Sequence, residues 1–146
     1  MLLDDFLIFS SEQAITATAS STNVVDLGAP KTPNGWTQAL PRDIGKGRNL
    51  PLIIRVVGAN FNTLTSLTAT LQMDTVENFA SPDIVATSGA IVLASLVVGY
   101  QFPIHWIIPG FNQRYMRLVY TVAGTDPTTG KIDAFIPASA QNWYTP

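Results

Sequence analysis

The sequence has no cysteine, a single histidine and few charged side chains. Without cysteine it has no disulfide framework, no thiolate metal site and no thiol nucleophile. Charged residues make up 12% of the 146 residues, whereas soluble proteins average about 25%. The 8 basic and 10 acidic side chains give a net charge of −2, so no basic field is present to hold a phosphate backbone. We therefore expect no nucleic-acid partner.

The sequence also lacks a basic, apolar start and a clean membrane span. Asp4 and Asp5 stand where a secretory signal carries basic residues, so we expect the chain not to be secreted from the cytoplasm where it is made. Residues 84–113 carry no charge, but polar residues and two prolines interrupt them and β-branched residues dominate the apolar part. A membrane helix requires about 20 mostly apolar residues. We expect no membrane partner.

The sequence offers few residues that could serve in catalysis. His105 is the one imidazole and no Gly-x-Ser-x-Gly elbow accompanies it, so we interpret it as a structural histidine on a strand face. The acids are scattered, and adjacent residues on a strand point to opposite faces, so Asp4 and Asp5 form no metal site. The Asp126–Gly130 segment lacks most ligands of a calcium loop and is predicted to be a hairpin turn. We predict no enzyme activity, no cofactor and no metal.

Apolar and alternating runs, separated by glycine and proline turns, predict a domain built from strands. Hydrophobic residues make up 47% of the chain, enough for one core, and we expect a single domain over 1–146. The predicted strands cover 7–9, 14–17, 24–27, 50–57, 67–74, 84–87, 90–93, 101–107, 115–122 and 131–136. Helical turns are predicted only at 76–81 and 93–98. This pattern is typical of an all-β sandwich or barrel.

Side-chain alternation predicts which face of each strand is buried. In 67–74 the odd-numbered residues Leu67, Ala69, Leu71 and Met73 are apolar and should face inward. In 115–122 the core set is Met116, Leu118, Tyr120 and Val122. The nearly continuous apolar run 50–57 predicts a strand buried on both faces. Alternation in 101–107 places His105 with Pro103 and Ile107, opposite Ile104 and Trp106.

The longest predicted loop covers residues 28–49 and is rich in proline and glycine. Long loops in compact domains are often functional. Its segment 42–48 carries four of the eighteen charges, but it is no Walker loop, because no Ser or Thr follows the lysine. A solvated loop and a contact loop for another protein chain both fit, and we favour the contact loop. Near the C-terminus, two aromatics either tuck back or meet a partner. The candidate interface residues are Trp36, Arg42, Lys46, Arg48, Trp143 and Tyr144.

Several segments, in the same order along the chain, resemble the small capsid cement (decoration) proteins of tailed bacteriophages. They are 1–4, 13–17, 21–28, 42–47, 86–91 and 114–125. The resemblance implies a jelly-roll-like antiparallel β-sandwich without a catalytic site. It further implies a homotrimer on the outer surface of the virion capsid that bridges subunits of the major capsid protein. Residues 30–41 depart from the pattern, and we expect Trp36 and the loop through Arg48 to contact the shell or the adjacent protomer.

Two other functions fit the same strand pattern. The first is another phage structural β-sandwich, such as a head fibre, a tail component or a fibre base. The second is a carbohydrate-binding β-sandwich module, in which an exposed Trp36, Trp106 or Trp143 stacks on a sugar ring. The number of copies per particle distinguishes the first function from a cement protein, and glycan binding tests the second.

Overall fold

The computed structural model describes residues 4–40, 44, 47 and 49–137. All strand pairs are antiparallel. The described residues contain no α-helix, only the short 3-10 turns η1 (Asp5–Leu7) and η2 (Leu93–Ser95). The predicted all-β fold is confirmed. No helix in this part of the chain is long and apolar enough to cross a membrane.

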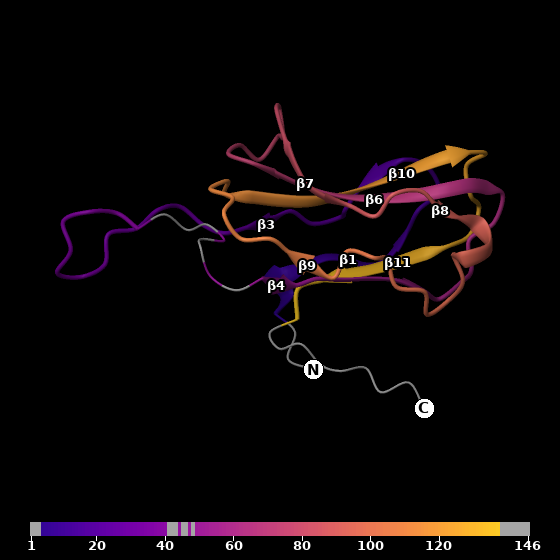
Figure 1. The fold of residues 1–146 in the computed structure, drawn as a ribbon, viewed down its shortest axis with the longest axis horizontal. Coiled ribbons are helices and arrows are strands. Elements are labelled where there is room, and N and C mark those ends of the chain that lie inside the picture. The colour runs from indigo at the N-terminus through magenta and orange to yellow at the C-terminus, as the bar shows by residue number, and fades with distance from the viewer. Residues whose placement is uncertain (1–3, 41–43, 45–46, 48, 138–146) are drawn as a thin grey trace.

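Two layers of sheet make up the molecule (Figure 1). The first sheet has the strand order β2-β10-β6-β7, with β3 also paired to β10 and β8 to β6. Its strands are β2 (Ala19–Ser20), β3 (Val25–Asp26), β6 (Leu64–Asp74), β7 (Asp83–Thr87), β8 (Ile91–Val92) and β10 (Tyr115–Gly124). The second sheet has the order β1-β11-β5, built from β1 (Ile8–Ala14), β11 (Lys131–Phe135) and β5 (Ile53–Val57).

A further strand extends the second sheet beyond β5. The short strands β4 (Leu50–Pro51) and β9 (Trp106–Ile107) pair with each other. Residues 100–102 also pair with β5, where Val56 N–H donates to the Tyr100 carbonyl and Phe102 N–H donates to the Ile54 carbonyl, each at 2.9 Å. Residues 99–107 therefore act as the fourth strand of this layer. The first layer likewise has four strand positions, because β2 and β3 share one side of β10, and β7 and β8 share one side of β6. With four positions in each layer and connections that pass repeatedly from one layer to the other, the fold is a jelly roll.

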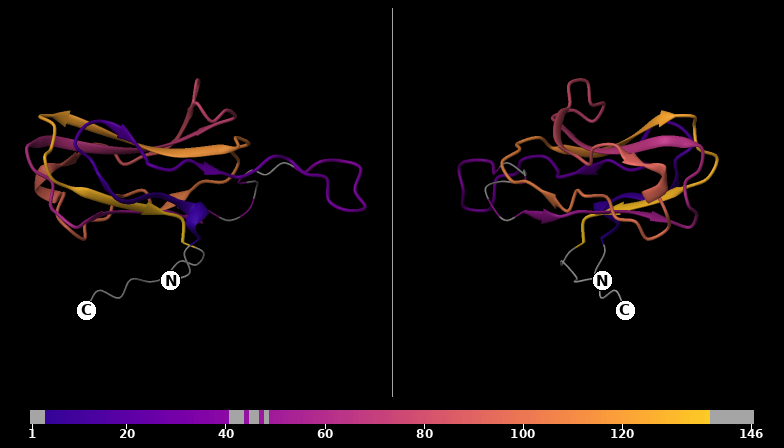
Figure 2. Two further views of the ribbon diagram at one scale, coloured as in Figure 1. Left: turned by 180° about the vertical axis from the view of Figure 1, so that it is seen from behind. Right: turned by 45° about the vertical axis from the view of Figure 1, so that its right-hand side comes forward.

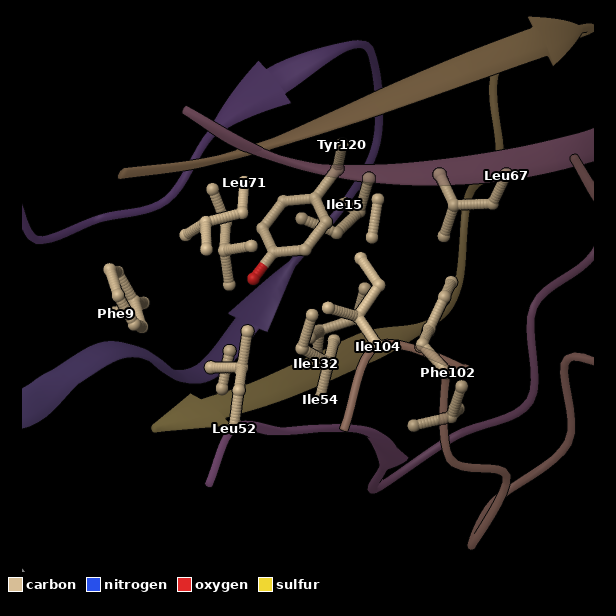
Figure 3. Close-up of a cluster of buried hydrophobic side chains, with 14 of the residues drawn as sticks. Phe9, Ile15, Leu52, Ile54, Leu67, Leu71, Phe102, Ile104, Tyr120 and Ile132 are labelled. Carbon is tan, nitrogen blue, oxygen red and sulfur yellow. The ribbon is translucent and has the colours of Figure 1, made fainter. Parts of the chain in front are cut away.

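The core lies between the two layers, where both inner faces contribute side chains (Figure 3). Leu67, Leu71 and Tyr120 point down from the first sheet, and Ile54 and Ile132 point up from the second (Figure 3). The predicted inward residues of β6 and the predicted core residues of β10 are buried, with Val122 only partly so. Each fully buried large apolar side chain stabilises the fold by about 1.5–3 kcal/mol relative to exposure.

The apolar run 50–57 and the predicted strand 14–17 differ from expectation. The run divides into β4 and β5, and in β5 buried and half-buried residues alternate, so the strand is not buried on both faces. Its other side faces outward and carries Arg55. The strand 14–17 is absent, because β1 ends at Ala14 and the chain crosses to the first sheet there. Ile15 fills the core at this crossing, which explains the apolar signal.

Two predicted turns also need correction. The Asp126–Gly130 segment is not a hairpin turn, because β10 belongs to the first sheet and β11 to the second, so it joins the layers. Residues 76–81 contain one hydrogen-bonded turn, in which Phe79 N–H donates to the Val76 carbonyl at 3.2 Å, but no helix. The buried carboxylate of Asp74 holds this segment in a tight loop, because it accepts hydrogen bonds from the N–H groups of Val76 and Ser81, both at 3.1 Å. The turn predicted at 93–98 is confirmed for its first part as η2.

Candidate functional site

Of the six predicted interface residues, the structure describes Trp36. Arg42, Lys46, Arg48, Trp143 and Tyr144 lie outside the described residues. Trp36 lies in a segment that extends far beyond one end of the sandwich (Figures 1 and 2, purple). We call residues 28–40 the arm. It is the part of the predicted long loop that the structure describes continuously.

The arm is a narrow loop whose two sides meet at a bridge. Lys31 and Leu40 pair with each other through two backbone hydrogen bonds of 2.9 and 3.3 Å. At the far end, Trp36 N–H donates to the Pro33 carbonyl at 3.1 Å. Gly35 has φ +82° there, which the third position of a type II turn requires and which other residues rarely adopt. The Pro-Asn-Gly-Trp sequence therefore sets the shape of the tip.

The arm exposes large apolar side chains to solvent. Trp36 is 60% exposed and Leu40 is 44% exposed. Lys31 is the single charged residue between 28 and 40. Aromatic residues are enriched at the cores of protein interfaces and charged residues are depleted there. The composition of the arm is thus that of a contact surface.

An ion pair next to the base of the arm joins Asp26, at the end of β3, to Arg114, the residue before β10. Arg114 donates from Nε to Asp26 Oδ1 and from Nη2 to Asp26 Oδ2, each at 2.6 Å. Its guanidinium also lies 4.8 Å from the centre of the Tyr115 ring. The hydrogen bonds from Arg114 lower the pKa of Asp26 below its usual value. Asp26 additionally accepts a 2.7 Å hydrogen bond from Gly28 N–H. The arm therefore projects from a defined point of the sheet.

A second feature is an apolar groove of about 350 Å³ along one side of the sandwich. It lies between β7, the end strand of the first sheet, and the 103–108 segment of the second. Its lining residues are Asn49, Ala86, Thr87, Pro103, Ile104, His105, Trp106 and Ile108. None of them is an Asp, Glu, Lys or Arg. Trp106 and Ile108 are 49% and 54% exposed.

Trp106 reaches the surface because the strand alternation slips by one residue. Gln101 pairs with Arg55 and Trp106 with Pro51, so this segment advances five positions (101 to 106) while its partner goes back four (55 to 51). The predicted orientation is wrong beyond this bulge: Trp106 faces outward and Ile107 is fully buried. For the residues before Trp106 the predicted orientation is confirmed, since Ile104 is buried and His105 is exposed.

The opposite side of the sandwich is closed by hydrogen bonds between the layers. Asn23 N–H donates to the Phe9 carbonyl at 2.9 Å, and the Asn23 side chain to the Ile8 carbonyl at 3.2 Å. Gln13 bonds both Thr22 N–H and the Ser20 carbonyl through its amide. The groove side is therefore the more open of the two.

A polar hollow of about 450 Å³ lies near the N-terminal end of β1. Three carboxylates line it, from Asp5, Asp26 and Glu77, together with Phe6. Within the described ranges, no three acidic, histidine or cysteine side chains come close enough together to hold a metal ion. One of the three, Asp26, is already paired with Arg114.

These features define a class of protein: a jelly-roll sandwich that carries a projecting arm and an apolar side groove. The chain belongs to the Bbp16 family, whose model matches residues 9–136. The match includes every described strand except the first residue of β1, and the arm lies within it. No curated protein matches the sequence.

Proposed function

We propose that this protein is a capsid cement protein that binds the outer surface of a phage head and bridges subunits of the major capsid protein as a trimer. The observation that carries the proposal is the projecting, nearly uncharged arm with its exposed tryptophan. The collinear resemblance of the sequence to phage cement proteins supports it independently.

The proposed role is mechanical and follows from mass action. A protein that binds the assembled shell and not its separated subunits stabilises the shell, and the stabilisation at each site grows with the logarithm of its concentration relative to Kd. Each contact needs an apolar centre that excludes water, with polar residues around it. The rigid sandwich supplies the body of such a contact, and the arm extends its reach beyond the body.

The first test is the number of copies of this chain relative to the major capsid protein in purified particles. A trimer at every three-fold position of the shell predicts a ratio of about one. A ratio of a few per cent would identify a vertex, tail or fibre component instead. Absence from particles would refute the proposal.

The second test is rebinding to particles stripped of this protein. Trp36→Ala combined with Arg48→Ala should reduce binding, whereas Phe6→Ala should leave binding unchanged. Phe6 is a suitable control because it is 86% exposed and lies outside the arm. Unchanged binding of the double variant would refute the role of Trp36 in the arm and of Arg48 in the loop that follows it.

The groove favours one other candidate function, carbohydrate binding. Trp106 offers an exposed aromatic face, and Asn49, Thr87 and His105 place polar groups beside it. Aromatic faces with neighbouring hydrogen-bonding groups are suited to sugar rings. A glycan array probed with the wild-type chain and with Trp106→Ala tests this candidate, which requires binding that the substitution abolishes.

A further inference from the structure

The arm leaves its apolar side chains without a cover in the single chain. Trp36 lies beside a tight turn and is 60% exposed, although an aromatic side chain can bury about 150–250 Å². A two-stranded hairpin is at best marginally stable in water by itself. A partner that covers Trp36 and Leu40 would therefore stabilise the arm.

The side groove has complementary properties. It is an indentation and not a projection, it contains no Asp, Glu, Lys or Arg, and its large exposed hydrophobic residues are Trp106 and Ile108. The arm has only Lys31 as a charged group. Apolar, uncharged surfaces associate without the cost of removing charges from water. The groove is therefore an indentation that can receive a projecting side chain, and both surfaces are nearly uncharged.

The arrangement of the two surfaces indicates that they meet between copies. The arm extends away from its own sandwich, whereas the groove runs along the side of it (Figures 1 and 2). Every chain carries one arm and one groove, so each arm in an assembly of identical chains has one groove available. One tryptophan buries less than the roughly 1,000 Å² that a stable interface requires, so repeated arm-to-groove contacts in a closed assembly are favoured.

We propose that the arm of one copy docks into the groove of a second copy, with Trp36 packed against Trp106 and Ile108. Because donor and acceptor are different surfaces, the contact closes either as a ring or as a reciprocal exchange between two chains. The inference rests on the self-association within the proposed function and names the contact that joins the copies. It is tested in solution without shells, so its failure is distinguishable from failure of capsid binding.

Site-directed cross-linking tests the contact directly, because the wild-type chain has no cysteine. Thr37→Cys on the arm and Thr87→Cys at the groove are made in separate chains, mixed, and treated with a short bismaleimide. Both positions are exposed, and Trp36 itself stays in place. We expect a heterodimer of Thr37→Cys with Thr87→Cys. Thr37→Cys mixed with Ser11→Cys, on the far edge strand β1, is the matched control and should remain uncoupled.

The same two cysteines placed in one chain distinguish a second copy from the chain's own groove. Cross-linked dimers or larger rings support docking between copies. Cross-linked monomers would overturn the proposal, because they show the arm in its own groove. Equal cross-linking of the Ser11→Cys control would overturn it as well.

Solution mass provides an independent test. Trp36→Ala and Ile108→Ser should each weaken self-association at least about tenfold, the loss typical of a central interface residue, with an unchanged circular dichroism spectrum. The charged pair Trp36→Glu with Ile108→Lys should recover part of the association that each single change removes. A monomeric wild-type chain, or variants with unchanged mass, would overturn the proposal.

Discussion

A buried pair of hydroxyl groups joins the two sheets and allows a sharp test of the packing. Tyr120 of β10 is fully buried, and its hydroxyl points from the first sheet toward the second (Figure 3). It lies 2.9 Å from Ser10 Oγ, which in turn donates to Gln13 Oε1 at 2.7 Å. Since Ser10 has one hydroxyl hydrogen and gives it to Gln13, the Tyr120 hydroxyl must be the donor to Ser10.

This direction predicts unequal effects of the two deletions. Ser10→Ala leaves the Tyr120 hydroxyl buried without an acceptor, which should cost about 1–3 kcal/mol. Tyr120→Phe leaves Ser10 bonded to Gln13 and should cost about 0.5–1.5 kcal/mol. In the Ser10→Ala background, however, Tyr120→Phe removes the stranded hydroxyl. We therefore expect Tyr120→Phe to destabilise the wild type and to stabilise the Ser10→Ala variant.

Urea unfolding measures these differences as shifts of the midpoint at constant slope. The protein concentration must be the same for all variants, because self-association would raise the apparent stability. Thr121→Ala, at an exposed position on the same strand, is the control and should stay within about 0.5 kcal/mol of the wild type. Additive effects of Ser10→Ala and Tyr120→Phe would refute the hydrogen bond between the two hydroxyls. A larger loss from Tyr120→Phe than from Ser10→Ala would refute the assigned direction.

Three further predictions concern pH, a turn and the arm. Burial raises the pKa of the Tyr120 hydroxyl above the usual 10.0, so the unfolded chain loses this proton at a lower pH than the folded protein. The free energy of unfolding should therefore fall as the pH rises above 10.0. Urea midpoints should show a smaller fall for Tyr120→Phe than for the wild type. Gly130→Ala should cost about 2–5 kcal/mol in thermal unfolding, because φ is +122° and the new methyl would lie 2.6 Å from Phe61 Cε1; a smaller loss would show that Phe61 can move. Asp26→Asn should speed amide hydrogen exchange at the base of the arm. In the wild type, the stability contributed by the Asp26–Arg114 pair is complete above the usual Asp pKa of 3.8. It disappears as the pH falls through the lowered pKa of Asp26.

Local sequence patterns were sufficient where the periodicity of a strand is continuous. In β6 the apolar residues alternate with threonine and glutamine, and both the strand and its buried face follow from that alternation. Asn34 and Gly35 between Pro33 and Trp36 likewise indicate a tight turn. The strand order of the two sheets does not follow from periodicity, because sandwiches of different topology share the same pattern, and the jelly roll was expected only from the resemblance.

Other features depend on contacts between distant segments. The outward position of Trp106 results from one extra residue relative to the β5–β4 partner, which only the pairing reveals. The groove is formed by strands of different sheets, so no single stretch of sequence indicates it. The interface residues predicted from charge and aromatic content fell mostly in segments outside the described residues. A signal for the groove was nevertheless present, since Ile104, Ile107 and Ile108 cannot all be buried on one face of a regular strand.

The register slip near Trp106 also has an evolutionary consequence. Side chains along a strand alternate between two faces. A gain or loss of one residue therefore turns every inward side chain outward, and every outward one inward, up to the next turn. Deletion of one codon between Gln101 and Trp106 would turn the indole toward the core and Ile107 toward solvent. A surface of this kind can therefore be created or removed in a single mutational step, while the rest of the sandwich keeps its sequence. Related chains that differ by one residue in this segment would then differ in binding specificity although they share the same fold.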